Sequence, residues 1–464
     1  MPRRPLLLSA VLALATLASC LNQRSEPALL VGVAKIDITP DFPIQLSGYQ
    51  ARPAEATRAE TRLHARALAI GSDRQRPAVL ITVELMGVGE ETSAAVAAAL
   101  QARHGIERAR VAICATHTHT GPALADVLPF MFSRDLPPAE AARIAAYTAT
   151  LREKLIKLAE AALADRRPAR LAWSEGRADF AVQRRVIAAG KWRAFGVTPG
   201  GPVDHALPVL RVTDVAGSLR AVLINYACHC TTLEGKDNYV HGDWAGLAAA
   251  RLEQASPGAV AMVAIGCGAD ANPNPRGATA VAGHAERVFA EVQRLLAAPM
   301  RPLGGVTHAA RRDLRLDLER AVPRAELQAR AANVQRTAAA YAAKRFLAEL
   351  DAGRAPPTAV PYPVQVWAFG SELTMVFLAG EVVAEYSLRL KRELAGSPLW
   401  VNAYANSVPC YVPSQRMIAE GGYEVDASMD YYGWPTRLAG DTEDRIVRTV
   451  RELVPTAVRP GGAP

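Results

Sequence analysis

Residues 108–122 read RARVAICATHTHTGP, a short apolar run that ends in two histidines one residue apart. Arg108–Thr116 has the apolar character of a buried strand, and turn-forming residues follow it. In an extended chain residues i and i+2 point to the same face, so His117 and His119 project together, with Thr118 opposite. Such a pair suits either one metal with two ligands, or one ligand and one neighbour that acts on a bound substrate.

Strands and helices alternate along the rest of the chain. Short apolar runs between turn residues predict strands, and apolar positions that recur with helical spacing predict helices. The expected strands are Leu30–Ile38, Ala78–Val83, Arg108–Thr116, Arg170–Trp173, Leu207–Val212, Ala221–Cys228, Ala259–Ile265, Val364–Phe369, Thr374–Leu378 and Leu399–Ala403. The expected helices are Thr92–Arg103, 138–165, Ala245–Gln254, Val281–Ala297, Arg324–Ala352, Glu381–Leu394 and Glu443–Leu453. This order predicts an α/β fold, with a mixed β-sheet core flanked by helices in a single large domain.

Polar side chains follow four of these strands, at the point where each strand ends. The clusters are His117 and His119 after Val111–Ala115, His229 after Ala221–Ala227, Gly268–Asn274 after Ala259–Ile265, and Gly380-Glu381 after Thr374–Leu378. Ligands of α/β sheets bind beyond the carboxyl ends of the strands. Convergence of the four clusters would therefore make one site.

A metal at this site would need more ligands than the histidine pair, because zinc takes three or four nitrogen, oxygen or sulfur donors. His229 is one candidate, and the cysteines on either side of it would point to the other face. Glu381 is another, because it is expected to open the helix Glu381–Leu394, where the helix dipole favours a carboxylate. The pattern favours a metal site over strand-end histidines that only satisfy backbone groups.

Composition and charge exclude some classes of protein. The chain has 464 residues, of which 50% are hydrophobic and 21% charged, as in a globular enzyme. The formal net charge is +8, but the basic residues are scattered and no basic run alternates with aromatic residues. We therefore expect no nucleic-acid partner.

The N-terminus, MPRRPLLLSAVLALATLASC, predicts export. Two arginines, an apolar run over Leu6–Ala18 and the ending Leu-Ala-Ser-Cys resemble a bacterial lipoprotein signal over residues 1–19. An acylated Cys20 would then anchor the protein at the cell envelope, on the periplasmic side or the outer membrane. An ordinary cleaved signal with an incidental cysteine is the alternative. We expect a tether over 20–30, a catalytic domain over 31–456 and a Pro/Gly tail over 457–464.

Five further cysteines would remain in the exported chain. They are Cys114, Cys228, Cys230, Cys267 and Cys410. An odd number argues against a full disulfide framework, and each lies in or beside an apolar run. The sequence therefore predicts free, buried thiols.

Five blocks of sequence occur in order between Val31 and Gly433. They are Gly32–Thr39; Thr116–Pro122; Ala227–His229 with Gly242-Asp243 downstream; Gly380-Glu381; and Asn406–Val412 with Gly422–Glu424, ahead of Tyr432-Gly433. Together they resemble the catalytic part of the neutral, non-lysosomal ceramidases. The resemblance covers most of the chain and implies that family's fold and its amide hydrolysis.

The resemblance also implies roles for single residues. Zn²⁺ would be held by His117, His229, Glu381 and Tyr411, with room for a water as fifth ligand. Zinc lowers the pKa of such a water and polarises an amide carbonyl. His119, beside the metal, would stabilise the oxyanion or shuttle a proton.

Two further residues match substrate-contacting positions of that family. Tyr423 would donate a hydrogen bond to the developing oxyanion, and Arg184 would contact the substrate. The adjacent Arg185 leaves that register open by one residue. A packed tyrosine and a surface arginine pair are the alternatives.

The chain departs from the family at Asn272, which stands where the ceramidases carry a serine proposed as nucleophile or substrate anchor. An amide cannot act as that nucleophile, so a metal-activated water remains, with Asn272 as a hydrogen-bonding partner of the substrate. Ala379 replaces a proline before Gly380-Glu381. The resemblance ends near Gly433, so we expect no C-terminal immunoglobulin-like domain.

The leading hypothesis is a zinc-dependent hydrolase of the neutral ceramidase type, which cleaves the amide bond of ceramide or a related N-acyl lipid. A zinc hydrolase of another envelope amide or ester, a non-catalytic ligand-binding lipoprotein and an amidohydrolase barrel are the alternatives. The barrel would carry its His-x-His motif on the first of eight strands. The strands that precede His117 and their uneven spacing count against it.

Overall fold

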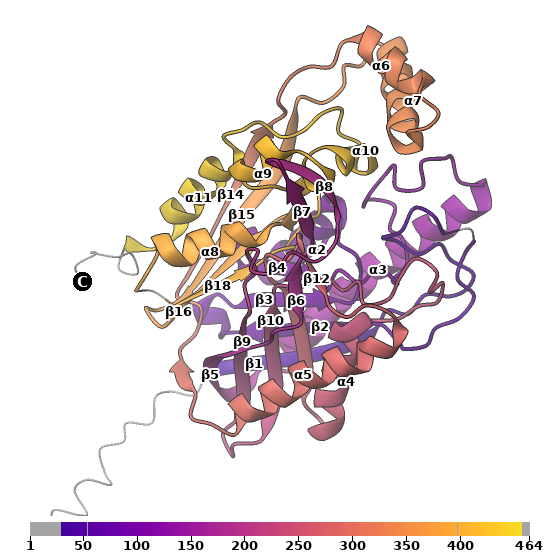
Figure 1. The fold of residues 1–464 in the computed structure, drawn as a ribbon. Coiled ribbons are helices and arrows are strands. Elements are labelled where there is room, and N and C mark those ends of the chain that lie inside the picture. Colours follow the sequence, from indigo (N-terminus) through magenta and orange to yellow (C-terminus); the bar gives the residue numbers. More distant parts are fainter. Residues whose placement is uncertain (1–28, 53, 397, 457–464) are drawn as a thin grey trace, which may run out of the picture.

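Two mixed β-sheets stack face to face, and helices cover the outer face of each sheet (Figure 1). The computed structural model describes residues 29–52, 54–396 and 398–456. The two sheets with their covering helices confirm the predicted α/β class and its flanking helices. The expected core sheet is, however, divided into two layers. The predicted export signal, Cys20 and the C-terminal tail lie outside the described residues.

The larger sheet has nine strands in the order β11-β10-β9-β5-β1-β2-β3-β4, with β13 beside β5. Its strands are β1 (Leu29–Asp37), β2 (His64–Ile70), β3 (Ala78–Val83), β4 (Val111–Ala115), β5 (Arg167–Arg177), β9 (Ala206–Asp214), β10 (Leu219–Tyr226), β11 (Val260–Ile265) and β13 (Arg301–Leu303). The pairs β3–β4 and β10–β11 are parallel and the other pairs are antiparallel. The two parallel pairs carry the two histidine loops.

The smaller sheet has the order β14-β15-β16-β18. Its strands are β14 (His308–Asp317), β15 (Ala359–Phe369), β16 (Leu373–Leu378) and β18 (Leu399–Asn402). Trp367, Phe377 and Trp400 are buried between the sheets, against Leu80 and Met262 of the larger sheet. Burial of each such side chain stabilises the fold by roughly 1.5–3 kcal/mol, so this apolar layer fixes how the sheets stack.

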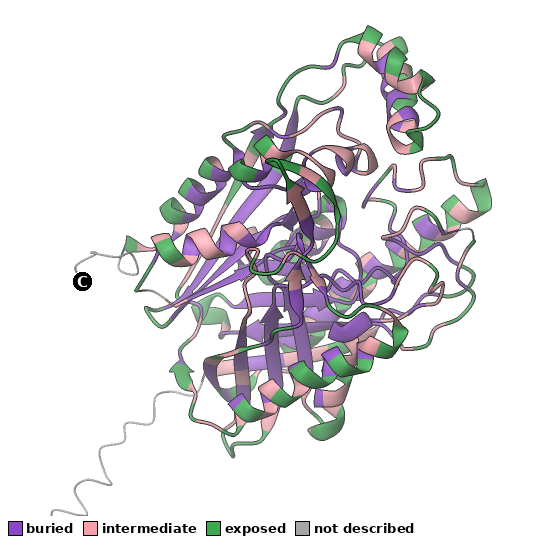
Figure 2. Cartoon of the chain, viewed as in Figure 1, coloured by how far each residue is buried: buried purple, intermediate pink, exposed green. Residues whose placement is uncertain are grey.

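Helices on the large sheet's outer face are α2 (Glu90–His104), α3 (Pro138–Ala164), α4 (Asp243–Ala255) and α5 (Ala278–Leu296). The predicted stripe of α3, which includes Leu151, Leu155 and Leu158, is buried against the sheet. The helices α8 (Ala384–Glu393) and α11 (Thr442–Leu453) cover the smaller sheet. Figure 2 shows the same division, with buried strands at the centre and exposed outer faces on the helices. No helix among the described residues is long and apolar enough to cross a bilayer.

Short elements fill the region where the two sheets meet. They are β6 (Ala181–Gln183), β7 (Arg185–Ala188), β8 (Lys191–Phe195), β12 (Ala271–Pro273), β17 (Glu381–Val382), β19 (Tyr411–Val412), α9 (Gln415–Glu420), η3 (Tyr423–Ala427) and α10 (Met429–Tyr432). β12 pairs with β6, and β17 pairs with β19. The small sheets carry three of the polar residues that the sequence singled out: Asn272, Glu381 and Tyr411.

Residues 403–406, which follow β18, tie the strand ends of the two sheets together. The Ala403 N–H donates to the Ile265 carbonyl at the end of β11 (2.9 Å), and the Asn406 N–H donates to the Ile113 carbonyl in β4 (2.7 Å). The buried Asn406 side chain also accepts a hydrogen bond from the Ile113 N–H (3.1 Å). The ends of β11, β4 and β18 therefore meet, although they lie far apart in sequence.

Two helix predictions were partly wrong: one expected helix is broken in the middle, and another begins later than expected. The expected helix Arg324–Ala352 is two helices, α6 (Arg324–Ala332) and α7 (Thr337–Asp351), because Asn333 leaves the helical conformation. The expected helix at Glu381 starts three residues later, at Ala384, because Glu381 pairs in a strand instead. The helix-dipole argument for Glu381 is therefore wrong, although its side chain still reaches the site.

The prediction for the cysteines is confirmed. All five in the described part of the chain are free and buried. Cys228 and Cys230 lie in the hydrophobic core, whereas the His229 ring lies with the other two histidines.

Candidate metal centre

The two histidines after β4 face each other across a tight turn. His117 has a positive φ of 59°, so the strand has already ended and the predicted i, i+2 strand geometry is wrong at this point. The rings nevertheless converge, with the two Nε2 atoms 3.2 Å apart. Both side chains are buried.

Backbone carbonyls set the tautomer of each histidine. The Nδ1 contacts are His117 to Met86 O (2.7 Å), His229 to Gly268 O (2.8 Å) and His119 to Gly48 O (3.1 Å). A carbonyl can only accept, so each Nδ1 carries a proton and donates it. The three Nε2 atoms are thereby directed to one point, in the arrangement by which carbonyls orient metal-binding histidines.

The carboxylate of Glu381 joins the histidines at this point. Its Oε2 lies 3.0 Å from Nε2 of His117 and 3.2 Å from Nε2 of His229. Its other oxygen, Oε1, accepts a hydrogen bond from the Tyr432 hydroxyl. Oε2 has no hydrogen-bond donor in the described part of the chain, although it is fully buried.

Electrostatics show what this cluster needs. Burial lowers the pKa of His229 to about 4 and holds the pKa of His119 well below its usual range, so both rings are neutral near pH 7. Burial raises the pKa of Glu381, and this pKa lies well below its usual range only if positive charge sits beside the carboxylate, where His117 and His229 approach it. Lone pairs and an ionised carboxylate thus crowd one buried point. A metal cation fits this donor set, since it supplies the missing positive charge.

Tyr411 completes the predicted ligand set. It pairs directly with Glu381 in the parallel β17–β19 ladder, and its hydroxyl lies 3.4 Å from Nε2 of His229. Burial and the Glu381 charge hold the pKa of Tyr411 well above its usual range. The structure therefore brings together all four residues expected as ligands: His117, His229, Glu381 and Tyr411. By position alone, His119 is within reach of the same point, since the three histidines form one compact group.

The two adjacent arginines, Arg184 and Arg185, have different partners in the structure. Arg184 directs its Nη1 to the Asn272 side-chain oxygen (3.3 Å) and its Nη2 to the Tyr411 hydroxyl (3.2 Å). Arg185 points away and pairs with Glu424 and with Glu420 (3.1 Å). Glu424 also accepts from Arg184 Nε (2.9 Å), so one carboxylate fixes both arginines. Arg184 is therefore the arginine that faces the site.

A cavity of about 390 Å³ opens beside the histidines. His119, Arg184, Asn272 and Glu381 lie on its walls together with Tyr423, whose ring is 5.4 Å from that of Tyr411. Apolar and aromatic side chains complete the wall: Leu128, Met131, Phe195 and Tyr431. A few convergent polar groups in an apolar cavity are typical of a site for an amphipathic small molecule.

Sequence reasoning missed the roles of two tyrosines. In the sequence Tyr432 is only part of the motif Tyr432-Gly433, yet its hydroxyl donates to Glu381. Tyr404 stacks on His117, with ring centroids 4.2 Å apart. Neither role has a local signal, because each partner lies tens to hundreds of residues away in the chain.

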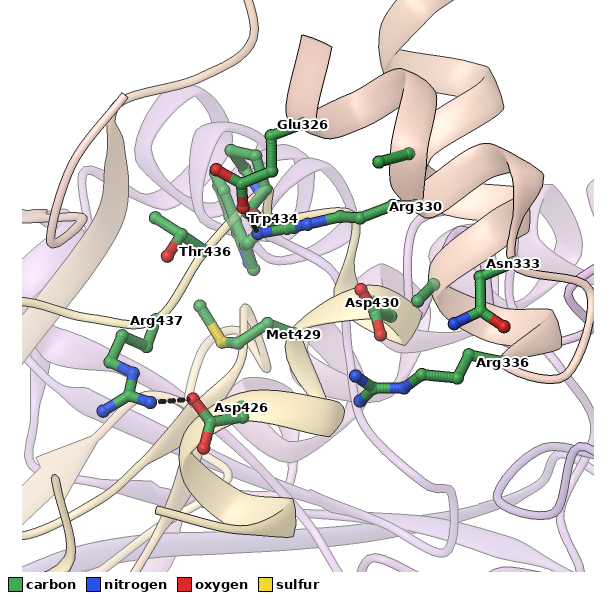
Figure 3. Close-up of a pocket in the computed structure, with 13 residues that line it drawn as sticks. Glu326, Arg330, Asn333, Arg336, Asp426, Met429, Asp430, Trp434, Thr436 and Arg437 are labelled. Atoms are coloured by element: carbon green, nitrogen blue, oxygen red, sulfur yellow. Dashed lines mark hydrogen bonds and ion pairs between the residues drawn. The ribbon is translucent and has the colours of Figure 1, made fainter. Parts of the chain in front are cut away.

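A second, larger cavity of about 560 Å³ lies between α6 and the segment 426–437 (Figure 3). Its walls carry opposite charges, some already paired, as Asp426 with Arg437 (2.5 Å) and Glu326 with Arg330 (2.5 Å). None of its described lining residues is a histidine or a cysteine. Of these two cavities, the smaller one is therefore the one beside the histidine group.

Imidazoles, a carboxylate and an arginine that converge in a cavity beyond strand ends define a hydrolase type of site. A family model described as neutral/alkaline non-lysosomal ceramidase, N-terminal, matches residues 29–287. The chain belongs to this family and is a hydrolase that acts on amide bonds. The match includes His117, His119, Arg184, His229 and Asn272. Glu381, Tyr411 and Tyr423 lie beyond it, and the fold alone brings them to the site.

Solved structures share the fold. A crystal structure of neutral ceramidase from Pseudomonas aeruginosa has a TM-score of 0.69 at 19% identity, over 94% of this chain and 74% of that chain. A structure described as ceramidase complexed with C2 also has a TM-score of 0.69, at 18% identity, over 93% and 75% of the two chains. No curated protein gives a significant sequence match.

The metal-free protein should lose stability as the pH falls from 7 to 4. The unfolded chain protonates His229 near pH 6.5, whereas burial keeps the folded pKa at about 4, so acid favours the unfolded state. This one group should lower the free energy of unfolding by on the order of 3 kcal/mol across that range. Chemical denaturation at several pH values measures it. The variant His229→Gln should show a flatter dependence, and an unchanged dependence would contradict the assigned neutral ring.

Proposed function

We propose that the protein is a zinc-dependent hydrolase of the neutral ceramidase type, which cleaves the amide bond of ceramide or a related N-acyl lipid with water. The observation that carries this proposal is the convergence of Nε2 of His117, Nε2 of His229 and Oε2 of Glu381 at one buried point, beside a largely apolar cavity. Family membership supports the amide chemistry, and the solved ceramidase complexed with C2 supports a lipid-like substrate.

The ligands of the metal would be His117, His229, Glu381 and Tyr411. Imidazole and carboxylate donors with an open position are typical of catalytic zinc, and the described cysteines are buried as free thiols. When bound, zinc would polarise the amide carbonyl and lower the pKa of a water molecule.

The other polar residues would handle the proton and the substrate. His119 has a neutral ring with its Nδ1–H fixed on Gly48 O, so its Nε2 can take a proton from water and return it to the leaving amine. Arg184 keeps its charge, because Tyr411 and Glu424 outweigh the effect of burial on its pKa. Tyr423 would donate a hydrogen bond to the carbonyl oxygen as negative charge develops there.

Asn272 would orient the substrate without forming a covalent bond to it. Its side-chain oxygen accepts from Arg184, which leaves its amide N–H groups for the substrate. The family's serine is absent at this position, so the acyl group would pass directly to water.

Purified protein should contain about one zinc per chain, and Glu381→Gln should weaken zinc binding by more than about 100-fold, since loss of even an outer partner of a metal ligand costs 10–100-fold. Hydrolysis of an N-acyl sphingosine should fall in parallel. Metal analysis and a fatty-acid release assay measure both. The exposed Glu372, in the turn between β15 and β16, gives the control Glu372→Gln. Full activity with zinc far below one per chain would overturn the proposal.

Asn272→Ala should lower kcat/KM by about tenfold, the effect of one lost substrate hydrogen bond, and leave the zinc content unchanged. Intact-mass analysis of acid-quenched wild-type reactions should detect no acyl adduct on the protein. An adduct that accumulates during turnover would contradict direct attack by water.

We also propose that the protein is exported and held at the cell envelope by a lipid on Cys20, close to a membrane-borne substrate. The motif Leu-Ala-Ser-Cys at residues 17–20 supports this. Cells grown with labelled palmitate should yield labelled protein, and Cys20→Ser should abolish the label. Equal labelling of the Cys20→Ser variant would contradict a lipid on this residue.

A further inference from the structure

The mouth of the catalytic cavity carries an arginine that the proposed mechanism does not use. Arg276 lines the cavity, and its side chain is exposed. Its Nε donates to the Thr231 carbonyl (2.7 Å) and its Nη2 donates to the Tyr49 hydroxyl (2.9 Å). These two contacts hold the guanidinium in place and use two of its five N–H donors. The remaining donors are free to bind a ligand in a fork geometry.

No carboxylate of the described residues lies within ion-pair distance of Arg276. The acidic residues of the neighbouring loop have other partners. Glu234 pairs with Lys236 (2.9 Å), and the fully buried Asp243 accepts from the backbone N–H groups of Leu233 (3.0 Å) and Trp244 (2.6 Å). Arg276 therefore makes no ion pair in the described part of the chain, although Glu234 and Asp243 lie close enough to interact with its charge.

A second arginine that makes no ion pair with a described residue lies behind Tyr49. Arg52 is 4% exposed and sits with its guanidinium carbon 5.0 Å from the centre of the Tyr49 ring. It donates to the backbone carbonyls of Ser47 (2.6 Å) and Asp237 (3.3 Å), and its Nε has no partner in the described part of the chain. Burial of the Arg52 cation is costly. The charge of Asp237 offsets part of that cost, and an anion in the cavity would offset more of it.

The rest of the cavity does not supply this anion. Glu381 is the one carboxylate among its described lining residues, and it faces the histidines. Arg184, which also lines the cavity, is paired with Glu424. Of the charged lining residues that the structure describes, Arg276 alone lacks an ion pair, which favours an anionic ligand beside it.

We propose that the preferred substrate carries an oxyanion, a carboxylate or a sulfonate, on its head group, and that Arg276 binds it at the mouth of the cavity while Arg52 adds to the positive field. This inference rests on the proposed function, because it names the substrate class of the same site. Arg276 is then a specificity-determining residue.

Binding is tested apart from cleavage by two ketone analogues, in which a methylene replaces the amide N–H of N-lauroylglycine or of N-lauroylethanolamine. Isothermal titration of the zinc-loaded wild type should show the anionic ketone binding about tenfold more tightly than the neutral one. The difference should shrink as salt is added. Arg276→Gln should remove it, Arg276→Lys should keep part of it, and the control Arg448→Gln, on the distant exposed face of α11, should leave it unchanged.

Cleavage of the two parent amides separates this inference from the proposed function. If the anionic ketone is preferred through Arg276 but neither amide is cleaved, the head-group inference stands and the proposed function fails. The head-group inference is overturned, and the proposed function stands, if both amides are cleaved but the two ketones bind equally well. The same holds if both amides are cleaved and Arg276→Gln leaves the affinity for both ketones unchanged. The expected result is a higher kcat/KM for N-lauroylglycine that falls to the level of N-lauroylethanolamine in Arg276→Gln, mainly through KM.

Discussion

The close approach of the Glu381 carboxylate to two imidazole nitrogens is the interaction on which the rest of the site depends. Its Oε2 lies within 3.2 Å of Nε2 of both His117 and His229, and its side chain is almost fully buried. An ionised carboxylate is stable there only if positive charge is shared with it. The site thus fits a cation, and the surrounding residues are arranged so that they would hold its ligands in place.

The fold supplies this geometry by bringing together strand ends from two sheets. His117 and His229 leave β4 and β10 of the larger sheet, and Glu381 follows β16 of the smaller one. Backbone carbonyls orient the rings, and the Tyr432 hydroxyl holds the second oxygen of Glu381. The segment 403–406 joins the two sheets, because its backbone N–H groups donate to β4 and β11 of the larger sheet and to β16 of the smaller one. Catalytic precision therefore comes from the scaffold more than from the loops.

Local patterns in the sequence predicted most elements of the two main sheets and the positions of the polar clusters, but they missed β2 and β14. Apolar runs and helical spacing gave most strands and helices, because these depend on nearest neighbours. The division into two stacked sheets was not predictable, since it depends on pairing between distant strands. The positive φ of His117 and the pairing of Glu381 with Tyr411 also come from tertiary contacts. The choice between Arg184 and Arg185 needed the position of Glu424, which lies far along the chain.

Zinc K-edge absorption of the zinc-loaded protein tests the central claim most directly, because it reports the ligands themselves. The account predicts a first shell of nitrogen and oxygen at about 2.0–2.2 Å, with the outer-shell scattering of at least two imidazoles and no sulfur. A sulfur shell at about 2.3 Å, or a shell of oxygen alone without imidazole scattering, would contradict a metal centre built on His117, His229 and Glu381.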